Sequence, residues 1–313
     1  MKRNEIKTVA ALLVAVILLA AILLAINSHT EEETAPEYLL SVNEADFTSL
    51  NFANGTDYVY LEKENGTWKM SDDPTFSVDQ EAVATAVKSL VTTKVTGKIN
   101  IESQSRLNDY SLLSPQCVIE YSLKNGSTGI IRIGTMSSLT EELYVLMGED
   151  FSTVYITSNE MAQAFSAAKL DFLRRPDIPT PSDGHEAVEI TNTYGTVRLY
   201  KEDGKWYIQK EDGPAEVSDD TAYNYYFLTW DMHWRGTVEH NAKDLSKYDL
   251  SLPRISYSLT YKQNGVESTF DLQLGSSLPD GTCYAKLKDS NDIFLLDSIM
   301  ADWLESTKEG DFQ

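Results

Sequence analysis

The chain has 313 residues, a net charge of −22 at pH 7 and only two cysteines. A body this acidic excludes a basic surface for nucleic acid, and two cysteines in so long a chain exclude a disulfide-built scaffold. We therefore predict no nucleic-acid partner and interpret Cys117 and Cys283 as buried, unpaired residues of strands. The length predicts two domains.

Residues 9–26 form an uncharged run of Val, Ala, Leu and Ile. A helix of this length spans roughly 27 Å, close to the roughly 30 Å hydrocarbon core of a bilayer. Lys2, Arg3 and Lys7 precede the run, and positive flanks stay in the cytoplasm. We predict a cytoplasmic tip (1–8), a single-pass anchor in the lipid bilayer of the cell membrane (9–26), and an extracytoplasmic body.

The alternative for this run is a cleaved signal peptide, which usually has a shorter apolar stretch and a small-residue cleavage site. The segment that follows, residues 27–39, contains three consecutive glutamates and is predicted to be a solvated acidic stalk.

The body repeats itself. One common offset aligns Trp68 with Trp206 and Tyr110 with Tyr248, and it also aligns the prolines that follow the two tyrosines. The repeated signature is Trp68, Tyr110, Leu112, Pro115 and Gly134 in the first half and Trp206, Tyr248, Leu250, Pro253 and Gly275 in the second. We predict two tandem repeats, 40–173 and 185–306, joined by a stiff proline-rich linker at 174–184 and followed by a polar tail at 307–313.

The first repeat begins with a hairpin of residues 58–63 and 67–70, because Asn65-Gly66 favours a tight turn. Val83, Ala86, Val87 and Leu90 have the spacing of one buried helix face, and Ser77 is the predicted cap. Strands are predicted at 117–123, 130–133, 143–147 and 153–157. A helix at 160–172 closes the repeat.

The second repeat follows the same order. A hairpin of 197–201 and 205–208 turns at Asp203-Gly204, and Ser218 caps a helix. The predicted buried face of this helix consists of Tyr223, Tyr226, Phe227 and Trp230. A helix at 298–306 closes the unit. The predicted fold class is therefore α+β: an N-terminal transmembrane helix followed by two tandem repeats of an antiparallel β-sheet unit with covering helices.

These motifs together resemble a bacterial family of unassigned role, domain of unknown function family 4340. Its signature, Tyr-Gly-Leu-x-x-Pro, occurs here from Tyr110 to Pro115 and from Tyr248 to Pro253, with Ser111 and Asp249 in place of the glycine. The resemblance covers about residues 40 to 305 and implies no catalytic residue. Members tend to be encoded beside ABC transporter components of the gliding-motility type, which implies an accessory role at a membrane complex.

Candidate functional residues are few. The four histidines have no metal-ligand spacing, and no nucleophile elbow, phosphate loop or zinc-protease motif is present. We predict no catalytic residue, cofactor or metal. If the other aromatic residues of the second helix pack in the core, Tyr225 and His233 remain as exposed candidates for contact with a ligand or partner.

Two functions compete on these grounds. The favoured one is a non-catalytic accessory or binding module of a membrane complex, with integral membrane partners such as ABC transporter subunits. The alternative is an extracytoplasmic enzyme, a hydrolase acting on envelope material. A groove between the two repeats is the expected place for a ligand.

Overall fold

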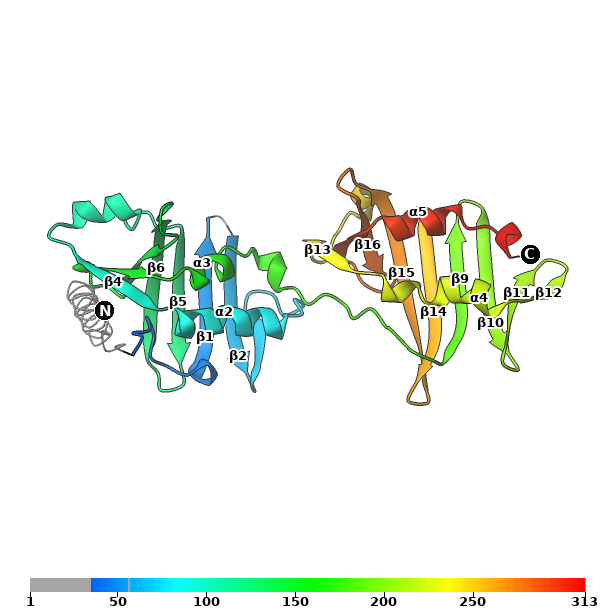
Figure 1. Ribbon diagram of the computed structural model, residues 1–313, viewed down its shortest axis with the longest axis horizontal. Helices are drawn as coiled ribbons and strands as arrows, with labels where there is room; N and C mark the ends of the chain where they lie inside the picture. The colour runs from blue at the N-terminus through cyan, green and yellow to red at the C-terminus, as the bar shows by residue number, and fades with distance from the viewer. Residues whose placement is uncertain (1–34, 56, 313) are drawn as a thin grey trace, which may run out of the picture.

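The computed structural model describes residues 35–55 and 57–312. They form two mostly antiparallel sheets with few helices, which lie side by side along the long axis of the molecule with the linker between them (Figure 1). None of the helices in this part of the chain is long and apolar enough to cross a bilayer. The anchor predicted at 9–26 lies outside the described residues.

The first sheet has eight strands, all paired antiparallel. In spatial order they are β3 (Thr67–Met70), β2 (Asp57–Glu64), β1 (Phe47–Asn54), β5 (Cys117–Leu123), β6 (Thr128–Met136), β7 (Leu143–Met147), β8 (Thr153–Thr157) and β4 (Val95–Asn100). Strands β1 and β4 were not predicted, and β6 is longer than the predicted strand at 130–133. In all three, polar outer residues mask the alternation of apolar positions.

The second sheet has nine strands. In spatial order they are β12 (Gly213–Val217), β11 (Lys205–Lys210), β10 (Gly195–Glu202), β9 (His185–Asn192), β14 (Ile255–Gln263), β15 (Val266–Ser277), β16 (Thr282–Leu287), β17 (Ile293–Asp297) and β13 (Trp234–Glu239). If β12 is set aside and the strands of each sheet are numbered from one in chain order, both sheets have the same spatial order, 3-2-1-5-6-7-8-4. The extra strand β12 is therefore the main difference between the two sheets.

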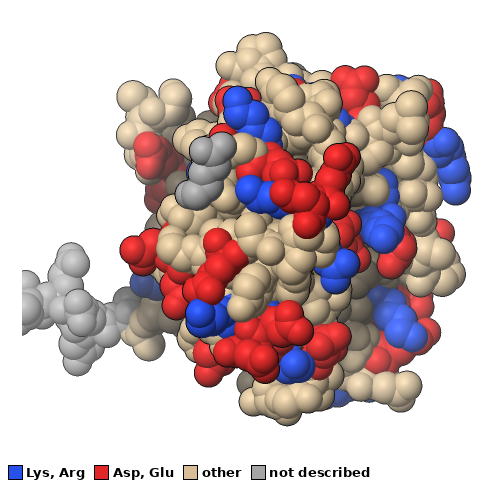
Figure 2. All heavy atoms as spheres, turned by 90° about the vertical axis from the view of Figure 1, so that its right-hand side faces the viewer, with Lys and Arg blue, Asp and Glu red and all other residues tan. Residues whose placement is uncertain are grey.

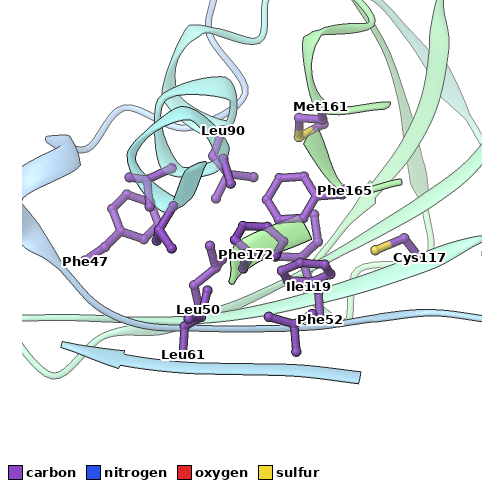
Figure 3. Close-up of a cluster of buried hydrophobic side chains, with 14 of the residues drawn as sticks. Phe47, Leu50, Phe52, Leu61, Leu90, Cys117, Ile119, Met161, Phe165 and Phe172 are labelled. Carbon is purple, nitrogen blue, oxygen red and sulfur yellow. The ribbon is translucent and has the colours of Figure 1, made fainter. Parts of the chain in front are cut away.

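The helices lie over the sheets. They are α2 (Gln80–Thr92), α3 (Glu160–Ala164), α4 (Asp219–Tyr226) and α5 (Ile299–Ser306), with short 3-10 helices η1 (Glu44–Asp46), η2 (Gln104–Tyr110), η3 (Lys169–Phe172), η4 (Leu228–Trp230), η5 (Leu245–Tyr248) and η6 (Glu309–Asp311). The four predicted apolar positions of α2 are all buried. They pack in one core with Phe47, Leu50 and Phe172 (Figure 3).

Both predicted hairpin turns are confirmed. Asn65 and Gly66 have φ angles of 50° and 86°, and Asp203 and Gly204 have 49° and 82°. Two successive positive φ angles are what a type I′ turn requires. The two strand cysteines are also buried as predicted and unpaired. Burial raises the pKa of both the Cys117 and the Cys283 thiol to about 12.

Two local predictions are wrong. Asp79, rather than Ser77, caps α2, because its side chain accepts from the N–H groups of Glu81 and Ala82. The helix predicted over 160–172 is interrupted between α3 and η3. Side chains distant in sequence hydrogen-bond to the backbone there. The carboxylate of Asp57 accepts from Lys169 N–H at 2.7 Å, and the amide of Asn54 donates to the carbonyl of Ser166, also at 2.7 Å.

The signature residues build one local arrangement in each sheet. Gly134 and Gly275 are buried where a Cβ would overlap the carbonyl oxygens of Tyr110 and Tyr248, respectively. Leu112 and Leu250 are buried at 2% exposure beside these glycines. Each tyrosine ring packs on another tyrosine, Tyr144 at 4.8 Å and Tyr284 at 4.9 Å between ring centroids. The residues after the tyrosines, Ser111 and Asp249, have φ of 58° and 56°, a conformation that glycine adopts most readily.

Acidic side chains are distributed over the outer surface at the β12 end of the molecule, with fewer basic side chains among them (Figure 2). Lys205 of β11 pairs with Glu216 of β12 at 2.8 Å. Exposed pairs of this kind contribute at most about 1 kcal/mol each. The surplus of acid on this face therefore serves solubility more than stability.

Candidate functional site

The two binding candidates from the sequence lie in different environments. His233 is exposed, and its Nδ1 lies 3.0 Å from the carbonyl oxygen of Asp231. Tyr225 is only 6% exposed, so the prediction that it is free to bind is wrong. Its ring stacks on Trp303 at 4.5 Å and packs on Phe312 at 4.8 Å. Segments from the end of the chain thus bury the helix face that local spacing left free.

The same contacts overturn the predicted buried face of the second helix. Tyr223 and Trp230 are 45% and 43% exposed. Tyr226 packs against the buried ring of His185 at 4.2 Å between centroids. The tail predicted as polar also contributes to the core through Phe312. The aromatic cluster is mainly structural, with Tyr223 and Trp230 at its outer end.

A groove of about 710 Å³ lies along the outer edge of β3. One wall is β3 itself, and the other is the segment 73–81, which leads into α2. Arg174, Arg175 and Asp177, at the start of the linker, close one side. We call this the β3 groove. Its volume is in the range of small-molecule and peptide pockets.

The groove is open because the chain leaves the sheet after β3. Val78 pairs with Leu173 in an isolated bridge. Asp79 N–H donates to the Phe172 carbonyl at 2.8 Å, and Arg174 N–H donates to the Ser77 carbonyl at 2.7 Å. The start of the linker therefore holds residues 77–79 away from β3. In the second sheet the corresponding segment lies on β11 as β12.

Gln80 bridges the inner part of this gap. Its side-chain oxygen accepts from Trp68 N–H at 2.8 Å, and its Nε2 donates to the carbonyls of Trp68 at 2.9 Å and Val78 at 3.1 Å. A side-chain amide thus satisfies the edge of β3 in the way that a neighbouring strand would. Gln80 itself is an exposed residue.

The outer wall of the groove also contacts the second sheet. Thr75 donates to Asp73 Oδ1 at 2.6 Å and accepts from the Asn241 amide at 2.7 Å. The bond from Thr75 lowers the pKa of the Asp73 carboxyl below its usual value. His240 lies 3.1 Å from the Thr75 hydroxyl. Its Nδ1 donates to Asp292 Oδ1 at 2.7 Å, because a carboxylate can only accept.

Apolar contacts complete this junction. The ring of Phe76 packs on His240 at 5.1 Å between centroids, and Phe294 of β17 belongs to the apolar core of the first sheet. Trp234 donates from its indole nitrogen to the Pro176 carbonyl at 2.8 Å. The wall of the groove, the linker and the second sheet are therefore tied together.

A second hollow of about 290 Å³ continues from the β3 groove. It shares Ser77, Arg174, Arg175 and Asp177 with the groove and adds Asp292 and Phe294 from the second sheet. Arg174 pairs with Asp177 at 2.8 Å, whereas Arg175 makes no ion pair with any residue the structure describes. One ligand can thus touch both sheets and a free guanidinium.

Carboxylates, arginines and main-chain groups line the β3 groove and the second hollow. Within residues 35–55 and 57–312 no group of three or more His, Cys, Asp or Glu side chains is placed to hold a metal ion. Asp73 and Asp79 are occupied by hydrogen bonds to neighbouring backbone and hydroxyl groups. The site offers main-chain groups, the Gln80 amide and arginines to an extended ligand.

The comparisons with known proteins place the chain. The family described as domain of unknown function (DUF4340) matches residues 68–228, just over half of the chain. The chain belongs to this family. The match begins in β3, crosses the linker and ends just after α4, so it contains every residue that lines the β3 groove except Thr67. No curated protein and no solved structure matches the chain.

Sequence reasoning missed the groove. It assigned Arg174 and Arg175 to a connector and found no metal-ligand spacing for His240 or the other histidines. The only local signal was two adjacent arginines in an acidic chain. The break between β3 and α2 shows no motif, because it results from pairing with the distant residues 172–174.

Proposed function

We propose that this DUF4340 protein is a membrane-anchored, extracytoplasmic accessory module that binds a partner of a membrane complex in its β3 groove. The apolar run 9–26, with basic residues before it, supports the anchor and the orientation. The family resemblance supports integral membrane partners such as the permease subunits of an ABC transporter. The body holds its partner and performs no chemical step on it.

The continuity of the β3 groove with the second hollow carries this proposal. An occupant meets β3 on one side, the arginines of the linker on another, and Asp292, the residue before β17, in the second hollow. Such convergence of two units on one cleft is a common place for ligands. The groove offers hydrogen-bond donors and apolar walls for affinity, without a nucleophile aligned to a base.

We infer further that the body arose by duplication of one unit. The common strand order, the glycines packed on tyrosine carbonyls and the paired tyrosines support this. Duplication makes β3 and β11 equivalent strands of the two sheets. One copy has its edge covered by β12, and the other has a groove there.

Site-specific crosslinking in native membranes tests the proposal. A photoreactive residue replaces Arg175 in the full chain, and the control replaces Tyr194, which is 68% exposed in the turn between β9 and β10. We expect an adduct with an integral membrane protein from position 175 and none from position 194. Equal adducts from both positions, or none from 175, would refute partner binding in the groove.

Two further measurements bear on the same proposal. Protease added outside spheroplasts should digest the body while a cytosolic marker survives; a protected body contradicts the orientation. The purified protein should not turn over envelope polymers or esters. Turnover that is lost on changing one acidic residue or histidine would establish the hydrolase alternative instead.

A further inference from the structure

The second sheet shows which kind of strand can pair with the edge of a tryptophan hairpin in this fold. Strand β12 lies antiparallel on β11, with Val217 opposite Trp206 and Ala215 opposite Ile208. Val217 is buried in the core, while Pro214 and Glu216 face the solvent. Glu216 pairs with Lys205 at 2.8 Å. A short strand with small or branched apolar residues at alternate positions is therefore a stable neighbour for this edge.

The first sheet presents the corresponding edge without a strand on it. Leu61 opposite Met70 and Leu199 opposite Ile208 are matching pairs in the two hairpins, so Trp68 and Met70 take the places of Trp206 and Ile208. Ser71 N–H donates to the carbonyl of Tyr60 on β2. By the alternation of antiparallel ladders, Trp68 and Met70 direct their main-chain groups away from β2 and into the groove.

The main-chain groups in the groove are only partly occupied. The N–H and carbonyl of Trp68 bond to the Gln80 side chain, and the carbonyl of Met70 accepts a long bond of 3.3 Å from Asp73 N–H. An incoming strand can use the N–H of Met70 at once. It gains both groups of Trp68 when the exposed Gln80 side chain turns into the solvent.

The remaining sheet edges are less available. Residues 37–39 pair with the beginning of β4, and β13 packs beside η3 of the first unit. Strand β12 carries Pro214, which has no N–H to donate. Among the edges that the structure describes, β3 is the one with a groove of about 710 Å³ beside it.

We propose that the β3 groove binds an extended segment of a partner polypeptide, which pairs antiparallel with β3 as β12 pairs with β11 and displaces the Gln80 side chain. This inference rests on the proposed function and specifies its partner. The segment has small or branched apolar residues at alternate positions. It carries at least one acidic side chain for Arg174 and Arg175, since Arg175 has no carboxylate partner among the described residues. Recognition is by strand addition to a sheet edge.

A peptide taken from the chain itself is the sharpest probe. A capped peptide with the sequence of residues 211–218 contains β12 and is acidic. The control is the same peptide N-methylated at Ala215 and Val217, which keeps the side chains but removes two main-chain donors on one edge. Saturation-transfer NMR with the full chain in detergent micelles detects weak binding through the valine methyl groups.

A matched pair of variants separates the groove from other surfaces. Gln80→Ala removes the competing amide, and alanine is favourable at the start of a helix. It should bind the peptide roughly 2- to 10-fold more tightly, the range of one or two hydrogen bonds. Gln209→Ala, an exposed glutamine of β11 in the second sheet, should leave the affinity unchanged. N-methylation should weaken binding by about tenfold or more.

The outcomes discriminate clearly. Equal binding of the two peptides, an affinity that Gln80→Ala leaves unchanged, or no saturation transfer at millimolar peptide would overturn the strand-pairing proposal. The crosslinking experiment remains independent of it. An adduct at position 175 without peptide binding refutes strand pairing but leaves the accessory function standing, whereas peptide binding without any membrane partner refutes the function.

Discussion

Gly275 is the position where one methyl group should disturb the second unit most directly. A Cβ added there would overlap the carbonyl oxygen of Tyr248 and lie 3.1 Å from Cγ of Leu250. A backbone oxygen cannot rotate away as a side chain can, so the end of η5 must move. Tyr248 is the last residue of η5, and its ring packs on Tyr284 while its hydroxyl donates to Glu239.

The expected cost follows from this geometry. Overpacking a closed site typically costs about 1–3 kcal/mol, and we expect about 2 kcal/mol for Gly275→Ala because two further contacts are displaced with the carbonyl. In a protein of this size each kcal/mol lowers the melting temperature by about 2–4 °C. The melting temperature should therefore fall by about 4–8 °C.

The assay is urea and thermal unfolding of the full chain in detergent, followed by tryptophan fluorescence. Gly236→Ala is the control, because the nearest atom to its added Cβ is Leu295 Cδ1 at 3.8 Å, an ordinary contact. We expect Gly236→Ala to change the stability by less than about 1 kcal/mol. Gly134→Ala, which meets the Tyr110 carbonyl, should behave like Gly275→Ala. If Gly275→Ala and Gly236→Ala unfold at the same urea concentration, the packing argument is wrong.

Three further predictions concern stability and reactivity. Burial lowers the pKa of His185. The contribution of neutral His185 to stability is therefore complete above the unfolded pKa of about 6.5 and is lost as the pH falls below that value. His185→Phe should flatten the fall in melting temperature between pH 7.5 and 5.5, and an unchanged slope would contradict this. Asp79→Ala should cost about 0.5–2 kcal/mol through loss of the helix cap, whereas Ser77→Ala should be nearly neutral in urea titrations; the reverse ranking would restore Ser77 as the cap. Both cysteines should resist maleimide at pH 8 in the native protein and react after denaturation with or without prior reduction, while labelling that needs a reductant would reveal a disulfide.

Much of the fold was predictable because its signals are local. Asn65-Gly66 and Asp203-Gly204 specify tight turns through their own backbone preferences. The spacing of the apolar residues in α2 predicted its buried face correctly, since one sheet covers that face. The family could also be recognised from the tyrosine, leucine and proline signature, and the family model matches residues 68–228, which include the first copy of that signature from Tyr110 to Pro115.

The candidate site could not be predicted in the same way. Its residues come from β3, the segment before α2, and the linker, and nothing in their spacing shows that residues 77–79 pair with 172–174. His240 carries no local signal, because its contacts with Thr75 and Asp292 join residues far apart in the chain. Only folding brings these polar groups together.

The sequence by itself determined the turns, the face that α2 buries, the cysteine environment and the family of this protein. Each of these depends on residues within a few positions of one another or on a recurring pattern along the chain. The tertiary structure decided that Tyr225 is buried, that the closing helix of the first unit breaks, and that β3 has a groove where β11 has a strand. Burial and edge pairing depend on which distant segment packs on a surface and satisfies its backbone groups, and only the whole fold determines that.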